Sequence, residues 1–571
     1  MAGKRPAVLG IDVGTSAVKL LLYFLAEKGE PPAPPPRIVR TEVEVSRPAP
    51  TQSEIDPAAW WRAVCRAAAR LDCSDAQVLG IGAAALFPSL VAMDDAGRPL
   101  RPAILYDDRR SAAEVQEFGR APLTHPALQH LLTGNVARPG TVSLSSLLWL
   151  RRHEPGVFAR ARLFGHAGTY LGLCLTGRPA VDAPSASLTG LYATASGEAW
   201  LRGVCRARGI PPEKLPARPG DLTYADYLDL LAADNPTVRD RILADLPPGM
   251  NQEAFLKGRP VLPESGWVQS LLDAVGLDRE RLPEVLWPAD RLGPLSKKAA
   301  GALSLEAGIP VAVGAGDAAC GALGLGLAAE GEMVVTCGST DCLTLLREIA
   351  AFSTRTMNVA YMDAGTWLEI APINSSGAAV DWFVGAFLGR ARDRYERFFR
   401  LAGEAPAGAG GVVFLPYLAG ERSPVYDPAA KGVFFGLTHR TGLPAMARAV
   451  LEGISFGHRQ VLRMADVRLG RPVGRGVAAG GCTIDPLWRR IRADAADRAY
   501  LYSDRAETSA LGAALLGGVA AGAFGSWREA AAEARRGLQF EEVRPDPAAW
   551  HTLNRNFEIY ASLYDALRHC F

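Results

Sequence analysis

The chain has 571 residues, of which 49% are hydrophobic and 21% are charged, and its formal net charge is +2. This composition excludes a disordered chain, and the near-neutral charge gives no case for nucleic acid or an anionic membrane surface as a partner. A chain of this length is too long for a single hydrophobic core, so we expect two large domains.

Further classes are excluded by two other features of the sequence. The most apolar stretch, residues 509–524, is short and rich in small residues, and it predicts a buried helix rather than a membrane span. The opening residues carry no signal-peptide pattern, and the nine cysteines form no CxxC pair. We therefore expect a cytoplasmic protein with reduced, structural thiols and no membrane partner.

The first predicted element is a β-hairpin over residues 7–25. An apolar run ends in Asp12, a second one carries Lys19 near its start, and the turn between them is Gly14-Thr15-Ser16. A glycine turn with two hydroxyls can cradle phosphate oxygens, Asp12 can hold magnesium, and Lys19 adds a positive charge. The same turn is common in hairpins without a ligand, so this segment alone leaves both interpretations open.

A mixed α/β sheet is predicted to follow. The alternating residues 38–45 predict a third antiparallel strand, and Asp56-Pro57 predicts a helix start with Asp56 as the N-cap. Apolar runs at 78–84 and 102–106 predict further strands. The loops after these two runs are where an α/β sheet would hold a small polar ligand. For the second loop, residues 106–110, a solvated turn with Asp–Arg pairs is the alternative.

The pattern then restarts after a stretch of different character. Residues 195–266 contain Pro-Pro pairs and short amphipathic pieces, and we expect an inserted subdomain of small helices there, without assigned chemistry. A strand at 309–313 leads to Asp317 and a helix of small residues. A second hairpin follows, with the turn Gly338-Ser339-Thr340. Two such turns predict two domains of similar design that each present one turn to the same polyphosphate.

Asp317 lies among glycines, between a predicted strand and a predicted helix. One interpretation is a helix N-cap, a position that Asp fills well. The other is a general base at the floor of an interdomain cleft, which accepts the proton of a hydroxyl that attacks phosphorus. The two hairpin turns favour the base, and both roles could coexist. A glycine pair at 480–481, between a strand and a helix, is a weak further sign of a ligand near the backbone.

Taken together, these segments resemble the FGGY carbohydrate kinases, and within that family the xylulokinases. The resemblance runs over nearly the whole chain outside residues 195–266. The collinear blocks that carry it are GIDVGTSAVK (10–19), EIDPAAWW (54–61), LRPAILYDDRR (100–110), LLWLRRHEP (147–155), GAGDAACGALG (314–324), FLPYLAGERSP (414–424), KGVFFGLTHRTG (431–442), ARAVLEG (447–453) and ALGAA (510–514).

This resemblance implies an α/β fold of the actin-like ATPase class, with two ribonuclease-H-like domains and a cleft between them. The sugar-side domain would span residues 1–309, the nucleotide-side domain residues 310–545, and a C-terminal helix residues 546–571. The implied activity is phosphoryl transfer from ATP, with Mg²⁺, to the hydroxyl of a small-molecule sugar such as D-xylulose. Whether the chain forms a homodimer stays open.

The resemblance also implies roles for single residues, carried over by position. The first phosphate loop would comprise Asp12, Gly14, Thr15, Ser16 and Lys19, and the second Gly338, Ser339 and Thr340. The residues around the adenosine would be Gly377, Gly480, Gly481 and Asp485. Asp317 would be the catalytic base, with Asp12 and Asp317 as the carboxylates at the metal. The sugar would meet Phe87, Tyr106, Asp108 and Asp317.

Two departures from the family pattern lie in the predicted sugar site. Phe87 stands where xylulokinases have a histidine, and Ala318 follows Asp317 where the family often has Asn. Each change removes a polar sugar contact, so we expect an active kinase with a shifted or relaxed acceptor. Two alternatives remain: a non-catalytic relative that binds sugar or nucleotide, and an actin- or chaperone-type ATPase of the same fold.

Overall fold

A computed structural model describes most of the chain. The described residues are 4–26, 33–121, 124–207, 223–232, 243, 251–259, 266–350, 352–481, 485–503, 505 and 507–571. The predicted insertion at 195–266 therefore lies largely outside the described residues. Its described helices are α8 (Gly197–Ala207), α9 (Tyr224–Ala232) and α11 (Gln252–Lys257).

The contacts within the chain divide it into two compact units, each built from several segments. Unit 1 comprises residues 1–328, 348–368 and 507–536, and unit 2 comprises residues 329–347, 369–506 and 537–571. The segment 507–536 belongs to the same unit as the N-terminal part of the chain, and the predicted boundary between residues 309 and 310 stays a prediction.

The central sheet of unit 1 contains the predicted hairpin. β1 (Arg5–Val13) pairs antiparallel with β2 (Ala17–Phe24), which pairs antiparallel with β3 (Arg37–Glu42). On its other side β1 runs parallel to β5 (Ala76–Ala85). The three consecutive antiparallel strands and the mixed sheet are therefore confirmed. The sheet is completed by β13 (Arg291–Pro294), β14 (Pro310–Ala312) and β15 (Ala315–Gly316).

The helix predicted from Asp56-Pro57 is α1 (Pro57–Ala68). The Asp56 carboxylate accepts a hydrogen bond from the Ala58 N–H at 3.0 Å, and Pro57 is the first helical residue, as predicted. Trp60 and Val64 are buried on the face that packs against the hairpin strands. Local capping chemistry and one apolar stripe thus suffice to set where this helix begins and how it faces.

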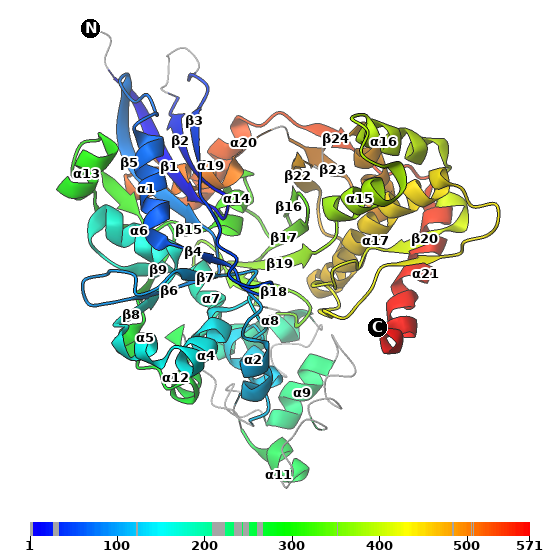
Figure 1. The fold of residues 1–571 in the computed structure, drawn as a ribbon, viewed down its shortest axis with the longest axis horizontal. Coiled ribbons are helices and arrows are strands. Elements are labelled where there is room, and N and C mark those ends of the chain that lie inside the picture. The colour runs from blue at the N-terminus through cyan, green and yellow to red at the C-terminus, as the bar shows by residue number, and fades with distance from the viewer. Residues whose placement is uncertain are drawn as a thin grey trace. The chain divides into compact units, whose positions relative to one another are not determined.

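Helix α19 (Thr508–Ala520) is the buried helix predicted near the C-terminus. Figure 1 shows it, in orange, beside the blue strands β1 and β5, which lie far from it in the sequence. A Cβ atom on Gly10 of β1 would lie 1.9 Å from the Ala510 carbonyl oxygen, so the helix backbone rests directly on the strand. The helix also packs against α14 (Asp317–Gly324). Its small residues make this close approach possible.

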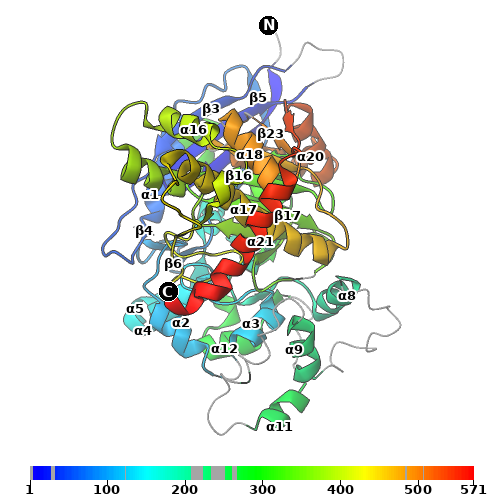
Figure 2. The same cartoon turned by 90° about the vertical axis from the view of Figure 1, so that its right-hand side faces the viewer.

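Unit 2 has its own sheet and contains the second predicted hairpin. β16 (Met333–Cys337) pairs antiparallel with β17 (Asp341–Arg347) and parallel with β22 (Gly476–Gly480). The neighbouring strands are β19 (Trp367–Ile373), β23 (Tyr500–Tyr502) and β24 (Glu541–Val543). In Figure 2 the helices α17 (Leu443–Leu469), α18 (Pro486–Ala496) and α21 (Trp550–Leu567) lie side by side, as their contacts require.

The remaining strands are short, and one of them, β18 (Met357–Ala360), is the edge strand next to β19 in the sheet that contains β16 and β17. A four-stranded sheet has the order β4-β7-β6-β8 and consists of β4 (Glu54–Ile55), β7 (Ala103–Leu105), β6 (Ser89–Met93) and β8 (Leu163–Gly165). The other short strands are β9 (Ala180–Asp182), β10 (Tyr192–Ala193), β11 (Gly266–Trp267), β12 (Glu284–Leu286), β20 (Val413–Leu415) and β21 (Val433–Phe435).

The remaining α-helices belong to both units. They are α2 (Ala112–Phe118), α3 (Pro126–Thr133), α4 (Ser143–His153), α5 (Pro155–Arg160), α6 (Ala167–Thr176), α7 (Ala183–Ser187), α12 (Gln269–Val275), α13 (Lys297–Leu303), α15 (Gly377–Phe383), α16 (Arg394–Glu404) and α20 (Trp527–Arg536). Among the helices of the described part of the chain, none combines the length and the hydropathy that a membrane span needs. The eight cysteines of the described residues are thiols rather than members of disulfides.

Candidate active site

Three neighbouring strands of unit 1 end at the same edge of the sheet. Asp12 of β1 pairs with Ala84 of β5, and Ala315 of β15 pairs with the same Ala84 from the other side. Because these strands are parallel, their carboxyl ends meet, and ligands bind at such ends in α/β sheets. Asp12, the loop after β5 and Asp317 directly after β15 are thereby gathered at one place.

Asp12 is buried and shares a cation with a second carboxylate. The Lys19 ammonium lies 3.5 Å from Asp12 Oδ2 and 2.6 Å from Glu507 Oε2. Burial raises the pKa of Asp12 to about 6; Lys19 lowers it and Glu507 raises it further. Burial alone would lower the pKa of Lys19, but its two carboxylate partners raise it above its usual value. The turn at 14–16 beside them is accessible to solvent, as a ligand-binding turn must be.

Asp317 is the first residue of α14, and Gly316 occupies the N-cap position. The interpretation of Asp317 as the helix N-cap is therefore wrong. Its Oδ1 accepts a hydrogen bond from the Ala318 N–H at 2.7 Å, and its backbone carbonyl accepts one from Ser509 Oγ at 3.0 Å. Burial, and to a smaller extent the charge of Asp12, raise the pKa of Asp317 to about 7. This carboxylate therefore holds a proton readily near neutral pH.

Glu507 is the residue of this site that sequence reasoning missed. It is the N-cap residue of α19, with a left-handed backbone at φ = +59°, and its carboxylate contacts Lys19 at 2.6 Å. Its only local signal was its place directly before the small-residue helix. That helix reaches the hairpin through packing between distant segments, which no local pattern reports.

Phe87, one of the predicted sugar contacts, follows β5 at the same edge of the sheet. A Cβ atom on Gly316 would lie 3.7 Å from Phe87 Cβ, so this side chain stands next to the Asp317 segment. Its ring meets the ring of His166 edge-on, with centroids 4.7 Å apart. His166 is buried, its Nε2 lies 2.8 Å from Ser143 Oγ, and burial lowers its pKa to about 3. The wall formed by Phe87 and His166 is therefore uncharged.

Asp108, another predicted sugar contact, is only 2% exposed and lies inside an ion-paired network. Its Oδ2 accepts hydrogen bonds from the Ser53 N–H and from Arg110 Nη2, both at 2.7 Å. Arg110 also pairs with Glu54 at 2.7 Å. The Asp–Arg pairing left open by the sequence is thus present, although buried rather than solvated. Tyr106 in the same loop is 39% exposed. The sugar-binding roles of both residues stay predictions.

In unit 2, the second predicted phosphate turn is held by the start of α15. The carbonyl of Gly338 accepts a hydrogen bond from the Gly377 N–H at 3.0 Å, and that of Ser339 accepts one from the Ala378 N–H at 3.0 Å. The side chains of Ser339 and Thr340 remain exposed. A fixed backbone and exposed hydroxyls are the features that a phosphate-binding turn needs.

The predicted adenosine segment begins beside this turn. Gly480 pairs with Cys337, the last residue before the turn. It has φ = +116°, and a Cβ atom there would lie 2.1 Å from the Cys337 carbonyl oxygen, so only glycine fits. Gly481 is exposed, and residues 482–484 lie outside the described residues. Asp485 caps α18, because its Oδ1 accepts from the Leu487 N–H at 2.9 Å.

Glu421 supports the segment that leads into α15. Its Oε1 accepts hydrogen bonds from the Asn374 N–H at 2.7 Å and the Arg422 N–H at 2.8 Å. Burial raises the pKa of Glu421 to about 8. The folded protein thus keeps a proton on Glu421 at neutral pH, whereas the unfolded chain releases it above its ordinary pKa of 4.5.

Glu421→Gln is expected to change how stability depends on pH. Between the unfolded pKa and about 8, the folded state binds more protons, so the wild-type free energy of unfolding falls as pH rises, by up to about 1.4 kcal/mol per pH unit. The glutamine variant cannot ionise and lacks this decline. In urea unfolding at pH 5, 6.5 and 8, the free energy of unfolding of the variant should increase relative to that of the wild type as the pH rises. Glu404→Gln, at an exposed position, is the control. If the variant and the wild type differ in their free energy of unfolding by the same amount at all three pH values, the expectation is contradicted.

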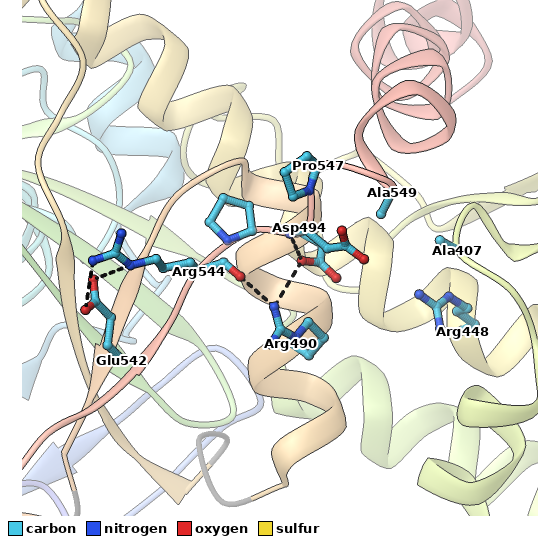
Figure 3. Close-up of a pocket in the computed structure, with 10 residues that line it drawn as sticks. Ala407, Arg448, Arg490, Asp494, Glu542, Arg544, Pro547 and Ala549 are labelled. Atoms are coloured by element: carbon cyan, nitrogen blue, oxygen red, sulfur yellow. Dashed lines mark hydrogen bonds and ion pairs between the residues drawn. The ribbon is translucent and has the colours of Figure 1, made fainter.

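A separate cavity of about 800 Å³ lies in unit 2, between α18 and the segment before α21 (Figure 3). Its charged groups pair with one another: Arg490 Nη1 donates to the Arg544 carbonyl at 2.6 Å and lies 3.9 Å from Asp494, and Arg544 contacts Glu542 at 3.2 Å. None of the predicted site residues lines it. The charged residues of this cavity therefore pair largely with one another, and we assign the cavity no role in the candidate active site.

Comparison with known proteins identifies the class to which this fold and site belong. Residues 7–221 match the N-terminal domain, and residues 333–521 the C-terminal domain, of the FGGY family of carbohydrate kinases. The chain is 29% identical over 520 residues to a xylulose kinase of Klebsiella pneumoniae, covering 90% of this chain and 89% of that protein. It is 24% identical over 534 residues to a gluconokinase of Bacillus subtilis (strain 168), and the match covers 91% of this chain and 88% of that protein.

A solved structure shows the same fold. The crystal structure of xylulose kinase from Rhodospirillum rubrum is similar with a TM-score of 0.79 at 24% identity, covering 98% of this chain and 99% of that chain. The protein belongs to the FGGY family of carbohydrate kinases. Its fold is α/β of the actin-like ATPase class, as the sequence resemblance implied, and it is an enzyme of the carbohydrate kinase class.

Proposed function

We propose that this protein transfers the γ-phosphoryl group of ATP to a hydroxyl of a ketopentose, with D-xylulose as the expected acceptor. The observation that carries the proposal is the gathering of Asp12, Lys19 and Asp317 at one edge of the unit 1 sheet. Relatives described as xylulose kinases support the choice of acceptor.

Asp317 is the proposed general base. Burial and the charge of Asp12 raise the pKa of Asp317 above that of a solvated carboxylate, which makes it a better proton acceptor. Its backbone is fixed at the start of α14, and its carbonyl is held by Ser509 Oγ. Asp317 would orient the sugar hydroxyl and accept its proton as that oxygen attacks the phosphorus in line with the leaving group.

The donor set also fits a magnesium ion beside ATP. Asp12 and Asp317 are carboxylates, and the charge of Asp12 raises the pKa of Asp317, so a divalent cation would relieve this repulsion. The described residues contain no group of three or more His, Cys, Asp or Glu side chains that could hold a metal alone. Mg²⁺ normally keeps several waters and takes phosphate oxygens as ligands, so Asp12 and Asp317 would suffice. When bound, the ion would offset charge on the phosphates.

The remaining phosphate contacts come from backbone and side-chain donors. Lys19 supplies a positive charge next to the turn at 14–16, and in unit 2 the exposed hydroxyls of Ser339 and Thr340 supply hydrogen-bond donors. Such preorganised donors stabilise the charge that develops on the phosphoryl oxygens in the transition state. Gly480 and Gly481 would admit the adenosine close to the backbone.

The sugar site is expected to differ from that of a strict xylulokinase. Phe87 and His166 form an uncharged wall next to Gly316, and Ala318 carries no polar group. A sugar hydroxyl that faced the Phe87 ring would find no hydrogen-bond partner in that ring, which penalises acceptors with a hydroxyl at that point. Acceptors that place a carbon-bound hydrogen rather than a hydroxyl against the Phe87 ring are favoured.

A coupled ADP-release assay tests the proposal. Purified protein is given ATP and Mg²⁺ with a panel of pentuloses, hexuloses, aldoses, polyols and gluconate, and turnover is compared with the sugar-free background. We expect one pentulose or a close analogue to give clear turnover. Strong ATPase activity that no sugar stimulates, or ATP binding without any turnover, would contradict the proposed function.

A further inference from the structure

A buried ion-paired cluster lies directly beneath the turn at 338–340 in unit 2. Cys337 ends β16 and Asp341 begins β17, and the two residues face each other across the hairpin. Asp341 is fully buried, and Arg492, from α18, is 1% exposed. A charge this deeply buried is costly unless it is paired, so these contacts constrain the backbone around them.

Arg492 contacts both ends of the hairpin turn. Its Nη2 donates to Asp341 Oδ2 at 3.0 Å, and its Nη1 donates to Cys337 Sγ at 2.8 Å. The guanidinium is a rigid planar fork, so two such contacts fix the distance between the residues that flank the turn. Lysine has a single ammonium on a flexible stem and cannot reproduce this geometry.

His458 completes the cluster from α17. Its Nε2 lies 2.8 Å from the same Asp341 Oδ2, and its Nδ1 lies 3.4 Å from Tyr500 Oη. Burial would raise the pKa of Asp341, but Arg492 and His458 outweigh that effect and lower it, so Asp341 is ionised. The negative charge of Asp341 is therefore shared between donors from two helices.

The position of Arg492 links two of the segments predicted to bind nucleotide. One segment is the turn at 338–340, whose flanking residues Arg492 contacts. The other comprises Gly480, which pairs with Cys337, and Asp485, which is the N-cap residue of α18, the helix that carries Arg492. A shift of the guanidinium would move the turn relative to these residues.

We propose that Arg492 is a positioning residue for the nucleotide, which sets the 338–340 turn in register with Gly480 and with the start of α18 through its contacts with Cys337 and Asp341. The inference rests on the proposed function, in which these two segments bind ATP. Misaligning a hydrogen bond to a charged phosphate costs about tenfold in affinity or more, so loss of Arg492 should raise KM for ATP and Kd for ADP by about tenfold or more. KM for the sugar should change little.

Two variants separate positioning from stability. Arg492→Met leaves Asp341 buried without its charge partner and should lower the melting temperature. The double variant Asp341→Asn with Arg492→Met removes both charges and should recover most of that loss. ADP affinity is measured by calorimetry below the melting temperature of each variant. We expect Kd for ADP to remain raised in the double variant, although its stability has returned.

Arg468→Met is a matched control at the other end of β17. Arg468 is buried and contacts Glu369, whose carboxylate lies 3.6 Å from Arg347, the last residue of β17. This substitution should lower stability and leave ADP affinity unchanged. If the double variant binds ADP as tightly as the wild type, Arg492 serves stability alone and the inference is overturned. Wild-type protein that binds ADP but phosphorylates no sugar would overturn the proposed function and leave this test intact.

Discussion

Asp317→Asn is expected to lower kcat by about 10²–10⁴-fold, the usual contribution of a general base, while the affinities for nucleotide and sugar stay within a few-fold of the wild type. Asparagine keeps the size of the side chain and the oxygen that accepts the Ala318 N–H at 2.7 Å. It cannot accept a proton from the sugar hydroxyl. The loss should therefore fall on turnover rather than on binding.

The measurement is steady-state ADP release with the best acceptor of the panel, together with ADP affinity by calorimetry. Asp290→Asn is the control, because the Asp290 carboxylate also accepts a backbone N–H, from Trp287 at 2.8 Å, but lies exposed in unit 1. The control should turn over like the wild type. Full activity in Asp317→Asn would show that another group takes the proton.

Gly512→Ala is expected to destabilise unit 1 by about 3 kcal/mol or more, at the upper end of what overpacking costs. A Cβ atom at this position of α19 would lie 1.9 Å from the carbonyl oxygen of Cys320 in α14. The position of the Cβ atom is fixed by the backbone of α19, and the carbonyl oxygen belongs to the backbone of α14, so neither atom can move away by a side-chain rotation. The N-cap residue of α19, Glu507, contacts Lys19, and Ser509 in its first turn contacts the Asp317 carbonyl, so activity should fall together with stability.

Urea unfolding and the melting temperature measure this effect. Gly301→Ala is the matched control, because Gly301 is also helical, in α13, but a Cβ atom there would have no heavy atom within 4 Å. Alanine at this position should be neutral or stabilising by up to about 1 kcal/mol. A Gly512→Ala variant that melts like the wild type would mean that α19 and α14 do not pack as closely as described.

The elements that the sequence predicted well are those with strong local chemistry. The hairpin at the N-terminus follows from two apolar runs around a glycine turn, and α1 follows from an Asp N-cap before proline. Both signals act within a few residues, so they survive in any tertiary context. Asp317 was also singled out locally, although its N-cap interpretation failed because Gly316 takes that position.

Other features depended on long-range packing and could not be predicted. The segment Tyr106–Arg110 looks like a solvated loop, yet Asp108 and Arg110 are buried in a network with Glu54. Glu507 meets Lys19 only because α19 lies on β1 and β5. Arg492 carries no motif at all, and only folding brings its guanidinium beneath the turn at 338–340.

From the sequence by itself, the resemblance of the collinear motifs to a known family indicated the class of protein, and local patterns predicted the two hairpin turns and singled out Asp317 as a candidate base. The tertiary structure alone decided which carboxylates share Lys19, which acidic side chains are buried and how the chain divides into compact units. These properties depend on burial and on contacts between segments far apart in the chain, and both arise only when the whole chain has folded.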